Sequence, residues 1–226
     1  PPVVGSRAVG DALLADRRAG RGQCVAHLLA GGVRRRVADP GTERVVEGEI
    51  VRPTGRLGDE PEASRRDRAD EPGRRGVELG VREGRFTKHL LLHVSDSHMT
   101  GVDSWCSLPA RDAPGAETYE RWPMARFRAE ALSLASLFPG RCRMLEMTTD
   151  EAALVVPDSS VDFVFVDADH TEEAVARDIA TWTPKVRPGG LIAGHDIRWP
   201  TVRRAVAASG PFEEAGHDQV WLRWIK

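Results

Sequence analysis

The chain has 226 residues, 41% hydrophobic and 29% charged, so it can bury a core and is not wholly disordered. Its 32 basic and 34 acidic residues give a net charge of −2, which argues against a dedicated nucleic-acid-binding protein. Apolar runs fall short of the ~20 residues of a membrane-spanning helix, and no signal-peptide pattern is seen. The three cysteines form no disulfide framework. We therefore expect a cytoplasmic protein without a membrane partner.

Aromatic residues divide the chain in two. All tryptophan, tyrosine and phenylalanine residues lie after position 76, the first being Phe86. Because aromatic side chains bury the largest areas, the main core is expected in residues 76–226. Residues 55–75 are almost entirely charged residues, Gly and Pro, a composition typical of a solvated linker. We therefore predict an N-terminal helical or irregular segment at 1–54, a polar linker at 55–75 and one folded domain at 76–226.

From residue 76 onward, short apolar runs alternate with amphipathic stretches, which predicts alternating strands and helices. Strands are expected at 76–80, 98–102, 143–147, 161–166 and 191–194. Helices are expected at 85–94, 117–138, 149–155, 172–183 and 201–208. Two further strands, 212–215 and 219–224, follow closely enough to form an antiparallel hairpin. This order predicts an α/β fold with a parallel sheet, covered by helices on both faces and ending in that hairpin.

The first strand, turn and helix contain a candidate ligand-binding motif, GVELGVREGRFTKHLL. Gly80 ends the strand where the backbone must turn, Gly84 allows the helix start to lie close to a ligand, and Glu78 adds an acid. The glycines are equally well explained as turn residues, and Arg82 stands where a dinucleotide motif would have glycine. Asp103, after the next strand, could accept both hydroxyls of a ribose or cap a helix.

Four ionisable groups follow two strands that we expect to be neighbours. Asp167 and His170 leave the end of one strand, and His195 and Asp196 leave the end of the next. Adjacent strands lie ~5 Å apart, so these side chains should converge. Such a set suits a divalent cation, or a general base beside the residue that orients it. The alternative is a chance group of helix caps.

The chain resembles class I S-adenosylmethionine-dependent methyltransferases in the order of four segments: VELGVREG, GVDSW, VDFVFVDADH and KVRPGGLIAGHD. Within that superfamily it is most similar to the branch of macrocin-type sugar O-methyltransferases and cephalosporin-biosynthesis methyltransferase-like proteins. The resemblance covers about residues 75–226. It implies a Rossmann-like, seven-stranded, mostly parallel sheet with the C-terminal antiparallel hairpin, and S-adenosylmethionine as the cofactor.

The resemblance also assigns cofactor contacts. Glu78, Gly80 and Gly84 match the motif that wraps the methionine part of the cofactor, and Asp103 matches the ribose-binding acid. Thr149 stands where members often have a serine near the adenine.

The chemistry is assigned to the second group of residues. Asp167 matches a carboxylate that binds magnesium in metal-dependent members, and His170 resembles the general base of sugar O-methyltransferases. Family members usually have an acidic pair at the end of the next strand, where this chain has His195 and Asp196. This difference puts magnesium dependence in doubt, because imidazole binds magnesium less well than carboxylate. Asp167 and Asp196 are the candidate ligands. His195 could bind the metal, support a ligand or contact the acceptor.

We expect methyl transfer to a hydroxyl of a small molecule, such as a sugar, saccharide or natural-product acceptor. His170 would be the base, and Asp167 would bind the metal or, without one, orient His170. The alternatives are an N-methyltransferase of the same fold and a non-catalytic cofactor-binding or assembly protein. The segment 1–54 could pack on a neighbouring subunit, which makes a homo-oligomer a further hypothesis. Aromatic residues near the strand ends are interpreted as core or lid residues before acceptor contacts: Trp105, Tyr119, Trp122 and Trp199.

Overall fold

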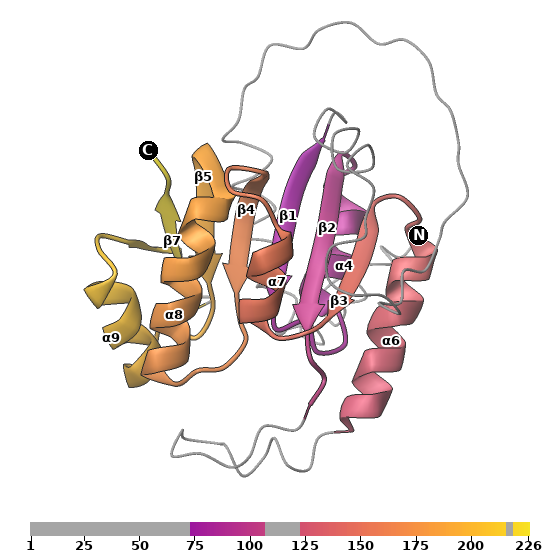
Figure 1. Cartoon of the computed structure of the whole chain (residues 1–226), viewed down its shortest axis with the longest axis horizontal. Helices are drawn as coiled ribbons and strands as arrows, with labels where there is room; N and C mark the ends of the chain where they lie inside the picture. The colour runs from indigo at the N-terminus through magenta and orange to yellow at the C-terminus, as the bar shows by residue number, and fades with distance from the viewer. Residues whose placement is uncertain (1–72, 107–122, 216–218) are drawn as a thin grey trace, which may run out of the picture.

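The computed structural model describes residues 73–106, 123–215 and 219–226. The strands in these residues form one seven-stranded sheet: β1 (Arg74–Leu79), β2 (Ser97–Asp103), β3 (Cys142–Glu146), β4 (Val161–Val166), β5 (Val186–Gly194), β6 (Glu213–Ala215) and β7 (Val220–Trp224). The α-helices described are α4 (Arg85–His93), α6 (Met124–Leu137), α7 (Thr149–Val155), α8 (Glu172–Trp182) and α9 (Pro200–Ala208). Figure 1 shows the helices arranged around this sheet.

The strand order is β3-β2-β1-β4-β5-β7-β6, and the strands from β3 to β5 are parallel. β7 pairs antiparallel with both β5 and β6, which confirms the predicted parallel sheet and its terminal hairpin. The chain runs outward from β1 to β3 and then returns to β4 on the other side of β1. The reversal places the carboxyl ends of β1 and β4 side by side at the point where open α/β sheets generally bind ligands.

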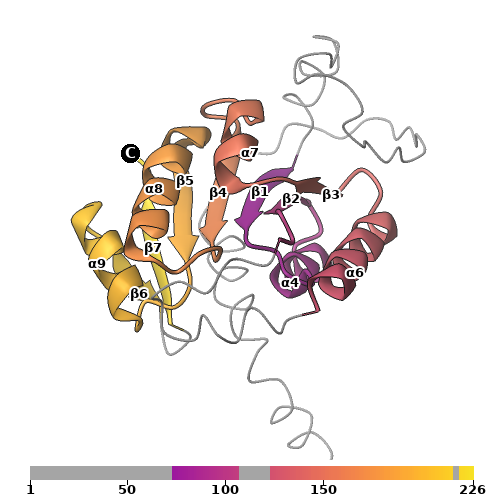
Figure 2. The same ribbon diagram turned by 60° about the horizontal axis from the view of Figure 1, so that its bottom comes forward.

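Helices cover both faces of the sheet, as Figure 2 shows, with α4 and α6 on one side and α7, α8 and α9 on the other. Strand β4 explains why both faces need cover. Its Val164 and Val166 pack in the cluster with α7, α8 and α9, whereas Phe163 and Phe165 pack in the cluster with α4. An uninterrupted apolar strand of this kind is typical of a parallel sheet buried on both sides.

Most observed elements begin and end within two residues of the predicted bounds, and the exceptions are the starts of β5 and α6. β4 and α7 have the predicted bounds, but β5 begins at Val186, before the predicted start at Leu191, because Val186 pairs with Val161 ahead of a register shift. Helix α6 begins only at Met124, after Pro123. Proline fixes φ and lacks an N–H, and helices tend to begin at or just after it.

Part of the predicted organisation lies outside the described residues. This applies to the segment 1–54, to most of the linker 55–75, to Tyr119 and Trp122, and to the connection between β6 and β7. The proposed domain division therefore stays a prediction, although β1 begins at Arg74, inside the range assigned to the linker. None of the helices described is both long enough and apolar enough to cross a membrane.

Candidate functional site

The site lies where the ends of β1, β2 and β4 are tied together. The backbone N–H of Asp167 donates to Leu79, and that of Gly80 donates to Val102, each at 2.9 Å. Gly80 has φ +84°, and a Cβ there would collide with the carbonyl oxygen of Asp167. Glycine is therefore required at this position both for its positive φ and for the close approach of the two turns.

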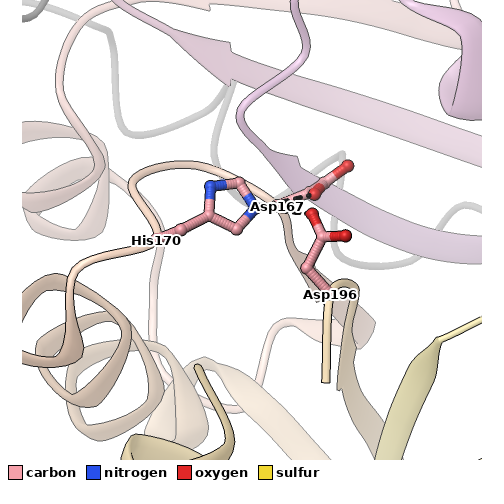
Figure 3. A group of neighbouring side chains, drawn as sticks. All are labelled: Asp167, His170 and Asp196. Carbon is pink, nitrogen blue, oxygen red and sulfur yellow. Dashed lines mark ion pairs between the residues drawn. The ribbon is translucent and has the colours of Figure 1, made fainter. Parts of the chain in front are cut away.

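Three predicted residues converge at this edge: Asp167, His170 and Asp196. Figure 3 shows their side chains directed toward one another from the loops after β4 and β5. Nε2 of His170 lies 2.8 Å from Oδ2 of Asp196 and 3.5 Å from Oδ1 of Asp167. One ligand atom from each residue lies within 4.8 Å of the other two. The structure thus brings together the predicted base and both predicted metal ligands.

Local structure places His170 and holds its ring. Thr171 is the N-cap of α8 and accepts from the N–H of Ala174, while Asp169 accepts from the N–H of Thr171 at 2.8 Å. Thr171 is thus the cap of α8, Asp169 holds the turn just before it, and His170 lies between the two. On its other side, the ring of His170 lies 4.8 Å, centroid to centroid, from the indole of Trp199.

Asp196 and His195 come from the turn after β5. Asp196 has φ +56°, a left-handed conformation that is disfavoured for residues with a Cβ. Strain of this kind tends to occur at functional sites, where the surroundings enforce it. His195 is 6% exposed, and its Nδ1 lies 3.0 Å from Oδ1 of Asp196, the carboxylate oxygen that His170 does not contact. His195 therefore lies beside the predicted ligand Asp196 and supports it.

The charges of the cluster are strongly coupled. Burial alone would lower the pKa of His170, but the carboxylates of Asp167 and Asp196 outweigh it and raise that pKa to about 9. Burial would likewise raise the pKa of Asp196, but His170 and His195 hold it well below its usual range. The two carboxylates therefore favour the protonated form of the His170 imidazole.

The geometry of the cluster fits a cation. Nε2 of His170 and Nδ1 of His195 are buried, and although carboxylate oxygens lie close by, neither nitrogen has a hydrogen-bond partner with suitable angles. Buried polar atoms are rarely left in that state. The carboxylates of Asp167 and Asp196 converge beside these nitrogens and offer oxygen ligands of the kind that a divalent metal ion binds.

The predicted cofactor residues Glu78 and Asp103 lie on β1 and at the end of β2. Glu78 is 2% exposed and accepts from the N–H and hydroxyl of Thr87, so its carboxylate is turned to α4. Burial raises the pKa of Glu78 to about 8. Asp103 accepts from the backbone N–H of Arg82 at 2.8 Å and of Trp105 at 2.7 Å. Because a carboxylate oxygen can accept more than one hydrogen bond, Asp103 keeps acceptor capacity for a ribose.

Gly84 and Thr149 have structural partners of their own. Gly84 is the N-cap of α4 with φ +87°, and a Cβ there would lie 2.8 Å from Leu134 of α6. The hydroxyl of Thr149, at the start of α7, donates to Asp178 at 2.7 Å. Asp178 is a buried acid of α8 that the sequence did not single out, because an Asp in the middle of an amphipathic helix has no spacing signal of its own. Contact of Gly84 and Thr149 with a cofactor stays a prediction.

Comparisons with known proteins bear on the family of this chain. A family model described as a methyltransferase domain matches residues 77–197, a range that contains every site residue from Glu78 to Asp196. No curated protein sequence gives a significant match to the chain.

Three solved structures are similar in fold. The O-methyltransferase NovP matches over 69% of this chain and 73% of its own, with 17% identity and a TM-score of 0.50. A Klebsiella pneumoniae protein with a proposed O-methyltransferase activity matches over 99% and 92%, with 16% identity and a TM-score of 0.50. The TDP-rhamnose 3'-O-methyltransferase CalS11 of calicheamicin biosynthesis matches over 72% and 76%, with 18% identity and a TM-score of 0.44. At these identities, the likeness to the first two structures is one of fold.

Proposed function

Since this chain belongs to the methyltransferase domain family, we propose that it transfers the methyl group of S-adenosylmethionine to a hydroxyl oxygen of a small molecule. Family membership implies S-adenosylmethionine as the methyl donor. The acceptor class that we propose is a sugar, a saccharide or a natural product with a free hydroxyl. The single observation that carries O-methylation is the cluster of Asp167, His170 and Asp196 at the carboxyl edge of the sheet.

The cluster supplies what an alcohol acceptor needs. The sulfonium methyl group is already activated, so the protein must align the acceptor oxygen with it and remove the proton of the hydroxyl. His170 is the ionisable group of the cluster suited to receive that proton, and Asp167 and Asp196 lie on its Nε2 side. The turn at Gly80 abuts Asp167, so the predicted cofactor motif and the loop that carries the predicted base lie side by side.

Asp167 and Asp196 are the residues that would hold a divalent cation, with magnesium as the candidate. When bound there, the cation would lower the pKa of the acceptor hydroxyl and fix its position. A general base must be neutral to accept a proton, and the carboxylates that raise the pKa of His170 are also the proposed metal ligands. A cation on Asp167 and Asp196 would offset their negative charge and so favour the neutral imidazole. The proposed base and the proposed metal site therefore depend on each other.

Two other functions make different use of the same fold. An N-methyltransferase acting on a small amine needs no strong base once the amine is neutral, and a non-catalytic cofactor-binding protein needs none at all. The buried cluster of two carboxylates and an imidazole favours the hydroxyl acceptor, because neither alternative requires it. A cytoplasmic location, a homo-oligomeric state and the absence of a nucleic-acid partner stay predictions.

Transfer of a labelled methyl group tests the proposal. The purified full chain is incubated with methyl-labelled S-adenosylmethionine and a panel of sugars, glycosides, phenols and amines, with magnesium or with a chelator. We expect the hydroxyl acceptors to give labelled products. These products should resist mild acid, as methyl ethers do. Labelled amines alone would favour the N-methyltransferase, and tight cofactor binding without any product would favour the non-catalytic protein.

A further inference from the structure

Two non-glycine residues with left-handed backbone lie on either side of the Asp103 carboxylate. Arg82, in the turn between β1 and α4, has φ +54°, and Trp105, after β2, has φ +44°. Residues with a Cβ adopt this conformation rarely, and it persists only where the surroundings impose it. Arg82 also stands where a related glycine motif would have glycine, so the strain at this position is a property of this chain.

Hydrogen bonds join the two strained residues into a closed unit. One oxygen of Asp103 accepts from the N–H of Arg82 at 2.8 Å, and the other accepts from the N–H of Trp105 at 2.7 Å. The indole Nε1–H of Trp105 then donates to the carbonyl oxygen of Arg82 at 2.8 Å. Both the N–H and the C=O of Arg82 are thereby held, the first by Asp103 and the second by Trp105.

Burial makes the indole bond effective. Trp105 is 6% exposed and packs with Val81 and Ala131, with Phe127 and Met144 at the edge of the cluster. A hydrogen bond that is partly shielded from water in this way meets less competition from solvent, and its loss leaves the carbonyl of Arg82 short of a partner. The guanidinium of Arg82 lies 4.7 Å above the ring of Phe127, which ties the same turn to α6.

We propose that Trp105 is a positioning residue for S-adenosylmethionine, acting through its indole N–H on the left-handed peptide of Arg82. The inference rests on the proposed function, because Asp103 and the turn after β1 are the predicted contacts of the ribose and methionine parts. A ligand that spans both elements binds more tightly when they are already in place. Trp105 holds the turn and the acid in one arrangement before the cofactor arrives.

Binding of S-adenosylmethionine and S-adenosylhomocysteine by calorimetry tests this role, with turnover as a second readout. Trp105→Phe keeps an aromatic ring but removes the N–H, and Trp224→Phe, at a 37% exposed site on β7, is the matched control. We expect Trp105→Phe to weaken binding about tenfold, the usual effect of losing one buried hydrogen bond, and to raise KM for the cofactor with little change in kcat. The control should bind as the wild type does.

A second substitution separates positioning from packing. Glycine adopts positive φ freely, so in an Arg82→Gly background the turn no longer needs the indole to hold it. We expect Trp105→Phe to weaken binding clearly less in that background than in the wild type. An equal loss in both backgrounds would assign Trp105 to packing and overturn the inference.

The remaining outcomes are equally decisive. Wild-type affinity in Trp105→Phe would overturn the inference and leave the proposed function intact. Failure of the wild-type chain to bind either ligand would overturn the proposed function and this inference with it.

Discussion

His170 and Asp196 follow different strands, yet Nε2 of the imidazole lies 2.8 Å from Oδ2 of the carboxylate. Both side chains are mostly buried, at 12% and 16% exposure. Their contact joins the ends of β4 and β5 at the edge where the predicted cofactor motif also ends. The proposed chemistry depends on this pair, because it brings the candidate base next to the candidate metal ligand.

Replacement of His170 tests the base. His170→Gln removes the titratable group but keeps a polar side chain of similar reach, so we expect turnover to fall by about 10²–10⁴-fold, the usual contribution of a general base. Cofactor affinity should change by less than about threefold, since His170 is not a predicted cofactor contact. His93→Gln, at an exposed position near the end of α4, is the matched control and should keep full turnover. Full turnover in His170→Gln would remove His170 from the role of base.

Metal removal tests the two carboxylates. We expect a chelator to reduce turnover strongly and added magnesium to restore it, because a bound cation would lower the pKa of the acceptor hydroxyl. Asp196→Asn should weaken magnesium binding by at least about tenfold in a calorimetric titration, since one anionic ligand is lost. Asp158→Asn, at a 68% exposed side chain, is the control. Turnover that is indifferent to the chelator would contradict the metal site.

Gly80 offers a test of the close approach between the turns after β1 and β4. In Gly80→Ala the new Cβ is strained by the positive φ and collides with the backbone of Asp167. We therefore expect the free energy of unfolding to fall by at least about 3 kcal/mol. Gly140→Ala is the matched control, because Gly140 has φ +75° but no atom within 4 Å of the added Cβ. It should cost only about 1 kcal/mol. Equal losses in urea unfolding would show that the two turns do not touch.

The buried acid of α8 predicts a pH dependence of stability. Burial raises the pKa of Asp178 from 3.8 to about 6, although the hydroxyl of Thr149 donates to it. A raised carboxylate pKa means that the folded state binds the proton more tightly, so the folded state is favoured below about pH 4 and loses this advantage as pH rises through 6. At pH 8 the ionised Asp178 should therefore destabilise the fold by about 3 kcal/mol relative to low pH.

Asp178→Asn isolates that effect. Asparagine keeps an oxygen for the hydroxyl of Thr149 but does not ionise, so the variant should be more stable than the wild type at pH 8 and similar to it at about pH 3.5, below the pKa of the unfolded state. Urea unfolding at both pH values measures the difference, and Asp150→Asn, at a 54% exposed neighbour, is the control. A pH dependence that is unchanged in Asp178→Asn would assign it to other groups, such as Glu78, whose pKa is raised to about 8.

Much of the fold follows from local pattern. The apolar run of β4 and the capping residues of α7 and α8 depend on neighbours along the chain, and the predicted bounds of β4 and α7 are those observed. Element ends were less predictable where a distant partner decides them. β5 begins at Val186 because Val186 pairs with Val161, a contact that no local pattern contains.

The candidate site could be predicted only in part, for a similar reason. Parallel pairing of β4 with β5 made the convergence of Asp167, His170 and Asp196 predictable, since adjacent strand ends must lie together. The partners of Glu78 and Thr149 were not predictable, because Thr87 and Asp178 are brought to them by helix packing. The hydrogen bond from Trp105 to Arg82 was not predictable either, since the orientation of the indole depends on its packing against α6.

By itself, the sequence determined the order of strands and helices, the polarity of the sheet, and the residue types that reach its carboxyl edge, because these depend on local periodicity and on the general rules of parallel sheets. Which charges face one another, and therefore the raised pKa of His170 between two carboxylates, depended on the tertiary structure. The physical reason is that pKa values and hydrogen-bond partners depend on distances of a few ångströms between residues far apart in the chain.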